Sequence, residues 1–435
     1  MVRWHVVLPA SAITFASFVG YSAFYPFIFL WLERQGFNEF TRSMVGGGYF
    51  VSKCLSPLLW GRIADRWQRH TTVLIGITLV GSAAVVWLSL QRRDLALQAA
   101  LFAIAGFFDN LPMLEAIVVR CLHHMDESAL VRHTRALASA AVGLCCPFFG
   151  FVSNGSEEGI AVLFVCYAGM MTCIVLPVVL LFMPVREAYA VAAPDEAAPE
   201  PKETALASEE AAAPKKTAPK QAPLADESTP LVVQRPARLL CTWRMSFFWL
   251  TFALVGVQMG VASACHMVYL ARQLHAPGVL LGLAEAIPVP LQIGIFLVAD
   301  RIVTWLTLPV AMHTCALAGA VRFAGFALVR NPWLVAFFEL AWGWTFPIFF
   351  TVSIQLAEEF APSGLQASVI SLNHTARQLG ATLVLFGSFA PLAAFGYPTT
   401  YALVASALAL FAAACGALTL LCPGSFGSSD GRVSR

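Results

Sequence analysis

Long apolar windows are the feature that most constrains the fold of this chain. A helix needs about 20 mostly apolar residues to cross the hydrocarbon core of a bilayer. The sequence holds six such windows before residue 185 and six more after residue 244. They lie near residues 6–32, 43–61, 72–90, 96–119, 130–152, 160–183, 245–271, 278–299, 305–328, 332–356, 366–389 and 397–422. We therefore predict an all-α membrane protein with twelve transmembrane helices in two six-helix bundles.

The charged residues concentrate between the two sets of windows. Residues 185–244 hold 17 of the 52 charged side chains (27 + 25). The segment is rich in Ala, Pro, Glu and Lys, a composition that cannot bury a core. The predicted organisation is an N-terminal bundle at 1–184, a disordered cytoplasmic linker at 185–244, a C-terminal bundle at 245–422 and a cytoplasmic tail at 423–435.

The overall composition excludes several classes of protein. The chain is 58% hydrophobic and 12% charged, whereas soluble proteins have about 25% charged residues. Its net charge of +2 gives no basic surface for nucleic acid. The eleven cysteines show no CxxC spacing and no clustering with histidine, so we expect no metal site and no cofactor. The sequence also shows no nucleophile–base pair and no phosphate-binding loop, so we do not expect an enzyme.

The distribution of lysine and arginine predicts the orientation of the chain. With the N-terminus inside, the inner segments outside the linker hold ten Lys/Arg and the outer segments hold six. This bias places both termini and the linker in the cytoplasm, in the plasma membrane or an endomembrane. Within the linker, Glu227–Val232 resembles an acidic dileucine sorting signal, although a chance product of linker composition is the favoured interpretation.

The two predicted bundles are related to each other. Ala64-Asp65-Arg66 follows the second window and Ala299-Asp300-Arg301 follows the eighth, at an offset of 235 residues. Pro112 and Pro347 share that offset. Equivalent features on corresponding windows are typical of two parallel structural repeats.

The segment after the second window carries a family resemblance. Gly61-Arg62-Ile63-Ala64-Asp65-Arg66-Trp67-Gln68-Arg69-His70 resembles the signature G-x-x-A-D-R-x-G-R-R/K of the major facilitator superfamily. Gln68 and His70 depart from that signature. The resemblance implies a transporter that works by alternating access. It also implies a conformational latch made of Gly61, Asp65, Arg66 and Arg69.

Two further segments resemble one branch of the superfamily. Arg135-Ala136-Leu137-Ala138-Ser139 and Glu358–Ala367 are similar to elements of the proton symporters related to lactose permease and nucleoside permeases. Ala138 stands where that branch has glycine.

Ionisable residues inside the windows must be paired or face water. Each costs about 2.5–3.5 kcal/mol when left alone at the middle of a membrane helix. Comparable depths predict an Arg322–Glu339 pair, with Glu285 as a competitor, and a Lys53–Asp109 pair. Ion pairs that only hold helices together are an equally acceptable interpretation. The seven residues are Lys53, Asp109, Glu115, Glu285, Arg322, Glu339 and Arg377.

The resemblance to lactose permease extends to the helices that carry these charges. Those symporters have acids on helices 4, 8 and 10 and arginines on helices 5 and 9, and this chain offers Glu115, Glu285, Glu339, Arg135 and Arg322. Burial of a carboxyl group favours its protonated form, whereas a neighbouring arginine favours the carboxylate. The predicted proton-coupling residues are Glu285, Glu339, Arg322, Glu115 and Asp109.

A polar stripe on the eleventh window predicts a cavity for the transported solute. Ser371, His374, Arg377 and Gln378 recur at helical spacing, and such a stripe cannot face lipid. On the first window, Tyr21 and Tyr25 lie one turn apart. A packed helix–helix contact explains the tyrosines equally well. For Arg377, the alternative is that it pairs with Glu285 or Glu339 and contacts no solute. The predicted cavity residues are Tyr21, Tyr25, Arg135, His266, His374, Arg377 and Gln378.

These features predict a secondary transporter that moves a small polar organic solute, with proton-coupled symport as the favoured mode. An uncoupled facilitator and a drug/proton antiporter are alternatives, and a receptor or scaffold with the same fold is a different class. The expected partners are the solute, protons and the lipid bilayer, and the protein is expected to be a monomer.

Overall fold

The structure is a computed structural model of the chain. It describes residues 4–67, 70–91, 94–111, 113–114, 118, 130–177, 243–360 and 366–421. The predicted linker lies outside these residues, apart from its last two. The described residues form helices and no strand.

The N-terminal half contains the helices of the first six windows. They are α1 (Trp4–Phe24), the 3₁₀ turn η1 (Tyr25–Phe27), α2 (Ile28–Arg34), α3 (Glu39–Trp67), α4 (His70–Leu90), α5 (Leu95–Phe107), α7 (Leu130–Ser153), α8 (Glu157–Met170) and the π-helical segment η2 (Met171–Val175).

The C-terminal half contains the helices of the last six windows. They are α12 (Trp243–Val261), the π-helical segments η3 (Ala262–His266) and η4 (Tyr269–Gln273), α13 (Gly278–Ala286), α14 (Val289–Leu306), α15 (Leu308–Leu328), α16 (Pro332–Phe337), α17 (Leu340–Phe360) and α18 (Gln366–Leu421).

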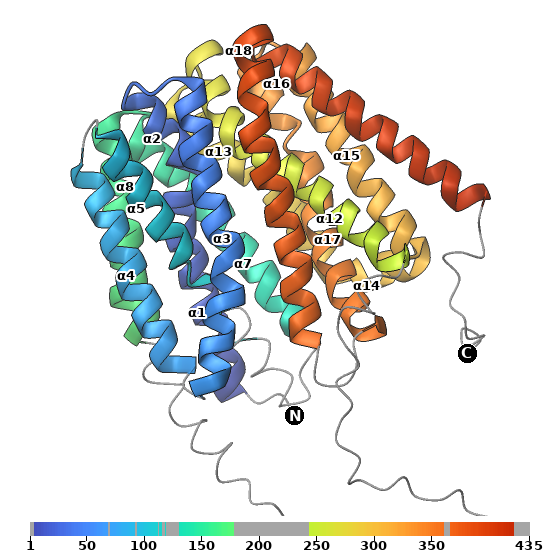
Figure 1. Cartoon of the computed structure of the whole chain (residues 1–435), viewed down its shortest axis with the longest axis horizontal. Coiled ribbons are helices and arrows are strands. Elements are labelled where there is room, and N and C mark those ends of the chain that lie inside the picture. The colour runs from blue at the N-terminus through green and yellow to red at the C-terminus, as the bar shows by residue number, and fades with distance from the viewer. Residues whose placement is uncertain are drawn as a thin grey trace, which may run out of the picture.

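The helix boundaries follow local capping signals. The side chain of Asp94 accepts a hydrogen bond from the Leu97 amide at the start of α5, and Ser156 does the same for Gly159 at the start of α8. Long α18 covers the last two windows, and its direction changes at Gly396, whose φ of 75° needs glycine. Figure 1 shows α18 running up the molecule and then turning down to the right.

Nine helical stretches in the described residues are long and apolar enough to cross a membrane. The other three predicted windows correspond to charged α3, to short α5 with the residues after it, and to the first part of α18. The all-α membrane fold is confirmed. Some helices run further than predicted. The largest extensions are those of α3, which continues to Trp67, so that Gly61 to Arg66 are helical, and of α14, which continues through Arg301 to Leu306.

The two halves lie side by side (Figure 1) and touch through a few helices. The contacts between the halves are made mainly by α7 with α13 and α14, and by α3 with α18. Within the C-terminal half, α18 packs most extensively on α12 and α15.

Candidate functional site

A buried ion pair lies in the C-terminal half. Arg322 Nη2 on α15 lies 2.5 Å from Glu339 Oε2 in the turn between α16 and α17. The two residues are 4% and 3% exposed, so both charges are removed from lipid and from bulk water. The guanidinium also lies over the rings of Phe323, Phe326 and Trp342 at 5.2–5.6 Å. The predicted Arg322–Glu339 pairing is therefore present.

His266 completes this group. Its Nε2 lies 3.3 Å from Glu339 Oε1, and its ring stacks on Phe326 at a centroid distance of 4.6 Å. Glu285 on α13 is half-buried and lies within electrostatic range of Glu339 and Arg322. We call Arg322, Glu339, His266 and Glu285 the acid cluster.

The charged side chains coincide with irregular backbone. Glu339 lies in the turn that separates α16 from α17, and His266 ends a π-helical segment. Asp109 follows the end of α5, and its carboxylate accepts a hydrogen bond from the Leu111 amide. Broken helices of this kind leave backbone groups free for side chains and ligands, and π-segments occur often at functional sites.

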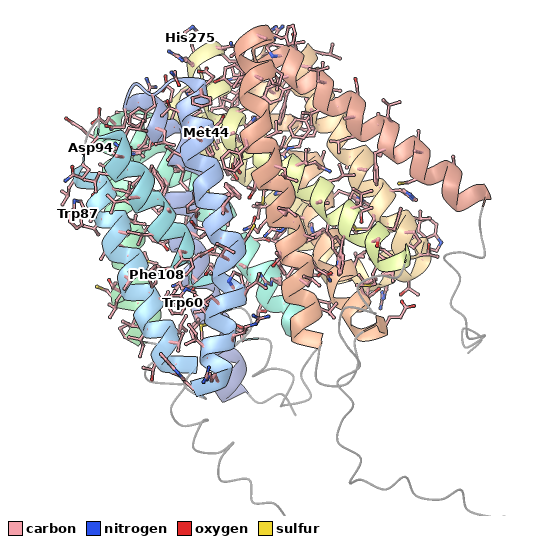
Figure 2. The ribbon with its side chains drawn as sticks, in the orientation of Figure 1. Met44, Trp60, Trp87, Asp94, Phe108 and His275 are labelled. Atoms are coloured by element: carbon pink, nitrogen blue, oxygen red, sulfur yellow. The ribbon has the colours of Figure 1, made fainter. Side chains whose placement is uncertain are left out.

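The second predicted ion pair is also present, in the N-terminal half. Lys53 Nζ on α3 lies 2.9 Å from Asp109 Oδ2, and both residues are buried. Lys53 also donates a hydrogen bond of 2.6 Å to Tyr21 Oη. Beside the Asp109 break, the ring centroids of Trp60 and Phe108 are 5.1 Å apart. Figure 2 labels both residues.

Aromatic rings enclose the Lys53 ammonium group. Tyr21 and Tyr25 stack at 4.9 Å. Lys53 Nζ lies 5.0 Å, 5.3 Å and 5.4 Å from the ring centroids of Tyr21, Tyr25 and Tyr49. An ammonium group near ring faces gains cation–π attraction, which increases when water is excluded.

The two halves meet next to these tyrosines. Tyr25 Oη and Ser263 Oγ of η3 are 3.0 Å apart, and Cys54 Sγ lies 3.9 Å from Thr382 Oγ1 of α18. One turn before Thr382, Gln378 is buried. The sequence pattern does not single out Ser263, Cys54 or Thr382, because a small residue in an apolar helix can equally well line a cavity or pack against a neighbouring helix.

Arg377 reaches the same region from α18. Its Nη1 donates to Met259 Sδ of α12 at 2.6 Å, and its guanidinium lies 5.8 Å from the Phe349 ring centre. Arg377, Tyr21, Tyr25 and Cys54 are only half-buried. We call Lys53, Asp109, Tyr21, Tyr25 and Arg377 the midplane cluster.

Arg135 and His374 lie on a neighbouring aromatic group. The Arg135 guanidinium of α7 covers the Phe350 ring of α17 at 4.1 Å, a contact between the halves. The His374 ring lies 6.1 Å from Phe349 and 6.2 Å from Phe350. The structure therefore separates the predicted cavity residues: Tyr21, Tyr25 and Arg377 belong to the midplane cluster, and His266 belongs to the acid cluster.

Polar contacts also join the halves at one end of the bundle, the upper end in Figure 2, where His275 is labelled. Arg272 of η4 lies 3.3 Å from Glu33 of the other half, and within α3 Arg42 lies 2.8 Å from Glu39. Tyr397 Oη of α18 accepts from Arg42 at 3.4 Å and donates to Glu39 at 3.4 Å. We call this group the end contact.

Some predicted residues cannot be placed. Glu115 and Arg69 lie outside the described residues, as does the side chain of Asp65, so the proposed latch remains a prediction. Gly61 and exposed Arg66 lie in the last turns of α3. Among the described residues no group of His, Cys, Asp and Glu has a geometry that fits a metal ion.

Comparison with solved structures shows the same fold in known transporters. The structure of the nucleoside transporter NupG is similar over 95% of this chain and 98% of its own length, with a TM-score of 0.71 and 14% identity. An auto-inhibited POT family peptide transporter is similar over 99% of this chain and 98% of its own, with a TM-score of 0.67 and 12% identity.

A POT family transporter in complex with a thioalcohol-conjugated peptide is similar over 95% and 96% of the two chains, with a TM-score of 0.63 and 10% identity. Comparison with curated protein sequences found no match. The sequence model of the MFS_1 like family matches residues 9–390. This match covers most of the chain, so the protein belongs to the MFS_1 like family and is a multi-pass membrane transporter of the major facilitator type.

Proposed function

We propose that this transporter is a proton-coupled symporter of a small polar organic solute. In this proposal the acid cluster carries the proton and the midplane cluster contacts the solute. The observation that carries it is the buried Arg322–Glu339 pair with His266 at 3.3 Å, because the carboxyl group of Glu339 and the imidazole of His266 can each gain or lose a proton beside a fixed positive charge.

The chemistry of the acid cluster supports this role. Protonation of Glu339 removes the negative charge that attracts Arg322 and His266, and so it changes the interactions among three helical segments. Burial favours the protonated acid and the nearby arginine favours the carboxylate. A movement that changes the distance between Arg322 and Glu339 therefore changes the affinity of Glu339 for a proton.

The end contact supports alternating access. We infer that this end faces away from the cytoplasm, as the lysine and arginine distribution predicts. The polar contacts of Glu33, Glu39, Arg42, Arg272 and Tyr397 then close the outer side of the midplane cluster. Opening the outer side requires these contacts to separate while the halves rotate about the midplane, as in other repeat transporters.

The experiment begins with a thermal-stability screen of the purified protein against sugars, nucleosides, organic acids and amino acids, since a ligand that binds the native state raises its apparent stability. Uptake of each hit is then measured in proteoliposomes with and without an imposed pH gradient. Symport predicts accumulation only with the gradient. Equal uptake without the gradient identifies a facilitator. Accumulation that is driven by a pH gradient of the opposite sign identifies an antiporter. If no hit is taken up, the protein is a receptor or scaffold.

A further inference from the structure

Aromatic side chains join the acid cluster to the end contact. At the acid cluster, the His266 ring stacks on Phe326 of α15 with 4.6 Å between the centroids. Phe326 packs on Tyr401 of α18 at 5.4 Å, and the ring of Tyr401 lies 6.5 Å from that of Tyr397. Tyr269 of η4 lies 5.4 Å from Tyr401 and 5.7 Å from Tyr397. We call these five side chains the aromatic row, since each ring is within the contact range of aromatic pairs from the next.

The two ends of the aromatic row carry polar contacts. At one end, the Tyr397 hydroxyl accepts a hydrogen bond from Arg42 and donates one to Glu39, each at 3.4 Å, and both partners belong to α3 of the N-terminal half. At the other end, His266 Nε2 lies 3.3 Å from Glu339 Oε1. Packed side chains therefore connect Glu339 to a contact between the halves.

The aromatic row is buried along its whole length. Phe326, Tyr269 and Tyr401 have no exposed surface, and His266 and Tyr397 are almost fully buried. Protein interiors are packed as densely as organic crystals and transmit strain. A displacement of His266 is therefore passed along the row to Tyr397, because its neighbours leave it no free space.

Several polar atoms beside the row lack hydrogen bonds. Among the described residues, no partner meets the Tyr401 hydroxyl, the Nδ1 atom of His266, or the Nε and Nη1 atoms of Arg322. A buried polar atom without a partner costs free energy, and contact with water removes that cost. The closed arrangement of this end is therefore opposed by unsatisfied groups, and it depends on attractions such as the Arg322–Glu339 pair.

The charge of Glu339 sets this balance. When a proton neutralises Glu339, Arg322 is left as a buried charge without a counter-charge, which is costly, and His266 loses its attraction to the carboxylate. An opening that admits water then becomes more favourable. The described charged or titratable groups that act on Glu339, from α15, η3, α13 and α18, are Arg322, His266, Glu285 and Tyr401.

We propose that the aromatic row couples the charge of Glu339 to the end contact, so that the carboxylate holds this end closed and the protonated acid favours its opening. This inference rests on the proposed function, because it gives the proton on Glu339 control over access to the site. Tyr401 and Tyr397 are positioning residues in this scheme, since they act on the acid cluster through Phe326 and His266. Coupling is reciprocal, so opening of the end contact also favours protonation of Glu339.

Distances between two spin labels in the full chain, reconstituted in nanodiscs, test the proposal. The labels are attached to genetically encoded keto amino acids, which leaves the eleven native cysteines in place. They are placed at exposed Leu95, which begins α5, and at exposed Leu328, which ends α15. Both positions are at the predicted outer ends of their windows, in opposite halves.

The first comparison tests the effect of charge. Glu339→Gln imitates the protonated acid, and we expect it to raise the ratio of long to short distances at least about fivefold. Glu359→Gln is the matched control, because Glu359 is an exposed acid near the other end of α17; it is expected to leave the ratio unchanged. No increase in Glu339→Gln, or an equal increase in Glu359→Gln, overturns the proposal.

The second comparison tests the path. Tyr401→Leu removes the ring between Phe326 and Tyr397, and in this variant Glu339→Gln is expected to change the ratio by less than about twofold. Tyr401→Phe keeps the ring and is expected to keep the full effect. Phe252→Leu is the matched control, because Phe252 is an equally buried ring of the same half that packs on Phe349, outside the row. An effect of Glu339→Gln that is as large in Tyr401→Leu as in the parent overturns the coupling.

Acidification gives the same test without a variant of Glu339. We expect lower pH to populate the long distances in the parent and in Phe252→Leu, but not in Tyr401→Leu. Protonation of Glu39 in the end contact would instead open all three proteins equally. That equal opening, or the absence of any opening in the parent, overturns the proposal.

These outcomes are separate from those of the proposed function, because the distances are measured without solute. A facilitator that has this coupling shows the changes in distance, together with solute uptake that does not depend on a pH gradient. A symporter that lacks it shows gradient-driven uptake, while Glu339→Gln has the same effect on the distances in Tyr401→Leu as in the parent.

Discussion

Arg322 and Glu339 form an ion pair that is buried in the C-terminal half, with 2.5 Å between Nη2 and Oε2. The two residues are 17 positions apart, with Arg322 on α15 and Glu339 in the turn between α16 and α17. His266 of a third segment approaches the other carboxylate oxygen of Glu339. The carboxylate therefore interacts with two basic side chains at once, and a change in its charge affects three segments.

The first prediction concerns the energy of this pair. Removing one partner of a buried ion pair costs about 3–5 kcal/mol, because the other charge remains buried alone, whereas removing both costs much less. We expect Arg322→Met to lower the thermal unfolding midpoint strongly, and Arg322→Met with Glu339→Gln to recover most of that loss. Arg301→Met is the control and should leave the midpoint unchanged. If the double variant loses as much in unfolding midpoint as the two single variants lose when added together, the result contradicts the pairing.

The second prediction concerns the Tyr21 hydroxyl. Tyr21→Phe removes the acceptor of the 2.6 Å hydrogen bond from Lys53 and leaves the ring in place. Hydrogen bonds to charged groups contribute about 1.5–3 kcal/mol. Tyr49→Phe keeps the ring that faces Lys53 at 5.4 Å and leaves this hydrogen bond intact. Tyr21→Phe should therefore lower the unfolding midpoint more than Tyr49→Phe does, and equal effects would show that the hydrogen bond contributes nothing.

The third prediction distinguishes the two parts of the end contact. The side chain of Arg42 is 5% exposed and contacts Glu39 and Tyr397, whereas that of Arg272 is 60% exposed and contacts Glu33. Exposed ion pairs contribute about 0–1 kcal/mol, and buried ones cost far more to break. We expect Arg42→Gln to open this end of the bundle and Arg272→Gln to leave it closed.

Spin labels at exposed Phe40 of α3 and exposed Leu403 of α18 report this opening as a distance distribution. Longer distances should become populated in Arg42→Gln alone. If Arg272→Gln lengthens the distances as much as Arg42→Gln does, the exposed pair is the effective contact and the assignment is wrong.

The fourth prediction concerns the close approach of α12 and α18. A Cβ at Gly256 would overlap the carbonyl group of Arg377, and one at Gly380 would overlap the carbonyl group of Ala253. Because backbone cannot move aside as a side chain can, Gly256→Ala should cost about 1–3 kcal/mol, as overpacking does. Gly387 on α18 has open space around its Cβ position. Gly387→Ala should be neutral or stabilising, and a loss of stability equal to that of Gly256→Ala would contradict this packing.

Much of the architecture could be predicted from the sequence, because a membrane imposes length and polarity on every helix. The windows near 130–152 and 305–328 match α7 (Leu130–Ser153) and α15 (Leu308–Leu328) within three residues. Comparable depth was enough to predict the pairs Arg322–Glu339 and Lys53–Asp109, since a lone charge in lipid is costly.

The contacts between the halves could not be predicted in the same way. Tyr25 and Ser263 are 238 residues apart, and Arg42 and Tyr397 are 355 apart. Such contacts depend on how the halves are rotated against each other, which apolar periodicity does not report. The position of His266 against Glu339 depends similarly on a π-helical segment, since the extra residue in such a turn changes which side of the helix each later side chain faces.

Proton movement in proteoliposomes, on addition of a solute that the thermal-stability screen identifies, tests proton coupling through Glu339 most directly. We expect the parent protein to take up protons together with the solute. We expect Glu339→Gln to lose this proton uptake while it still exchanges labelled for unlabelled solute at equilibrium. Solute-dependent proton uptake that is unchanged in Glu339→Gln, or solute uptake by the parent without any proton movement, would contradict this coupling.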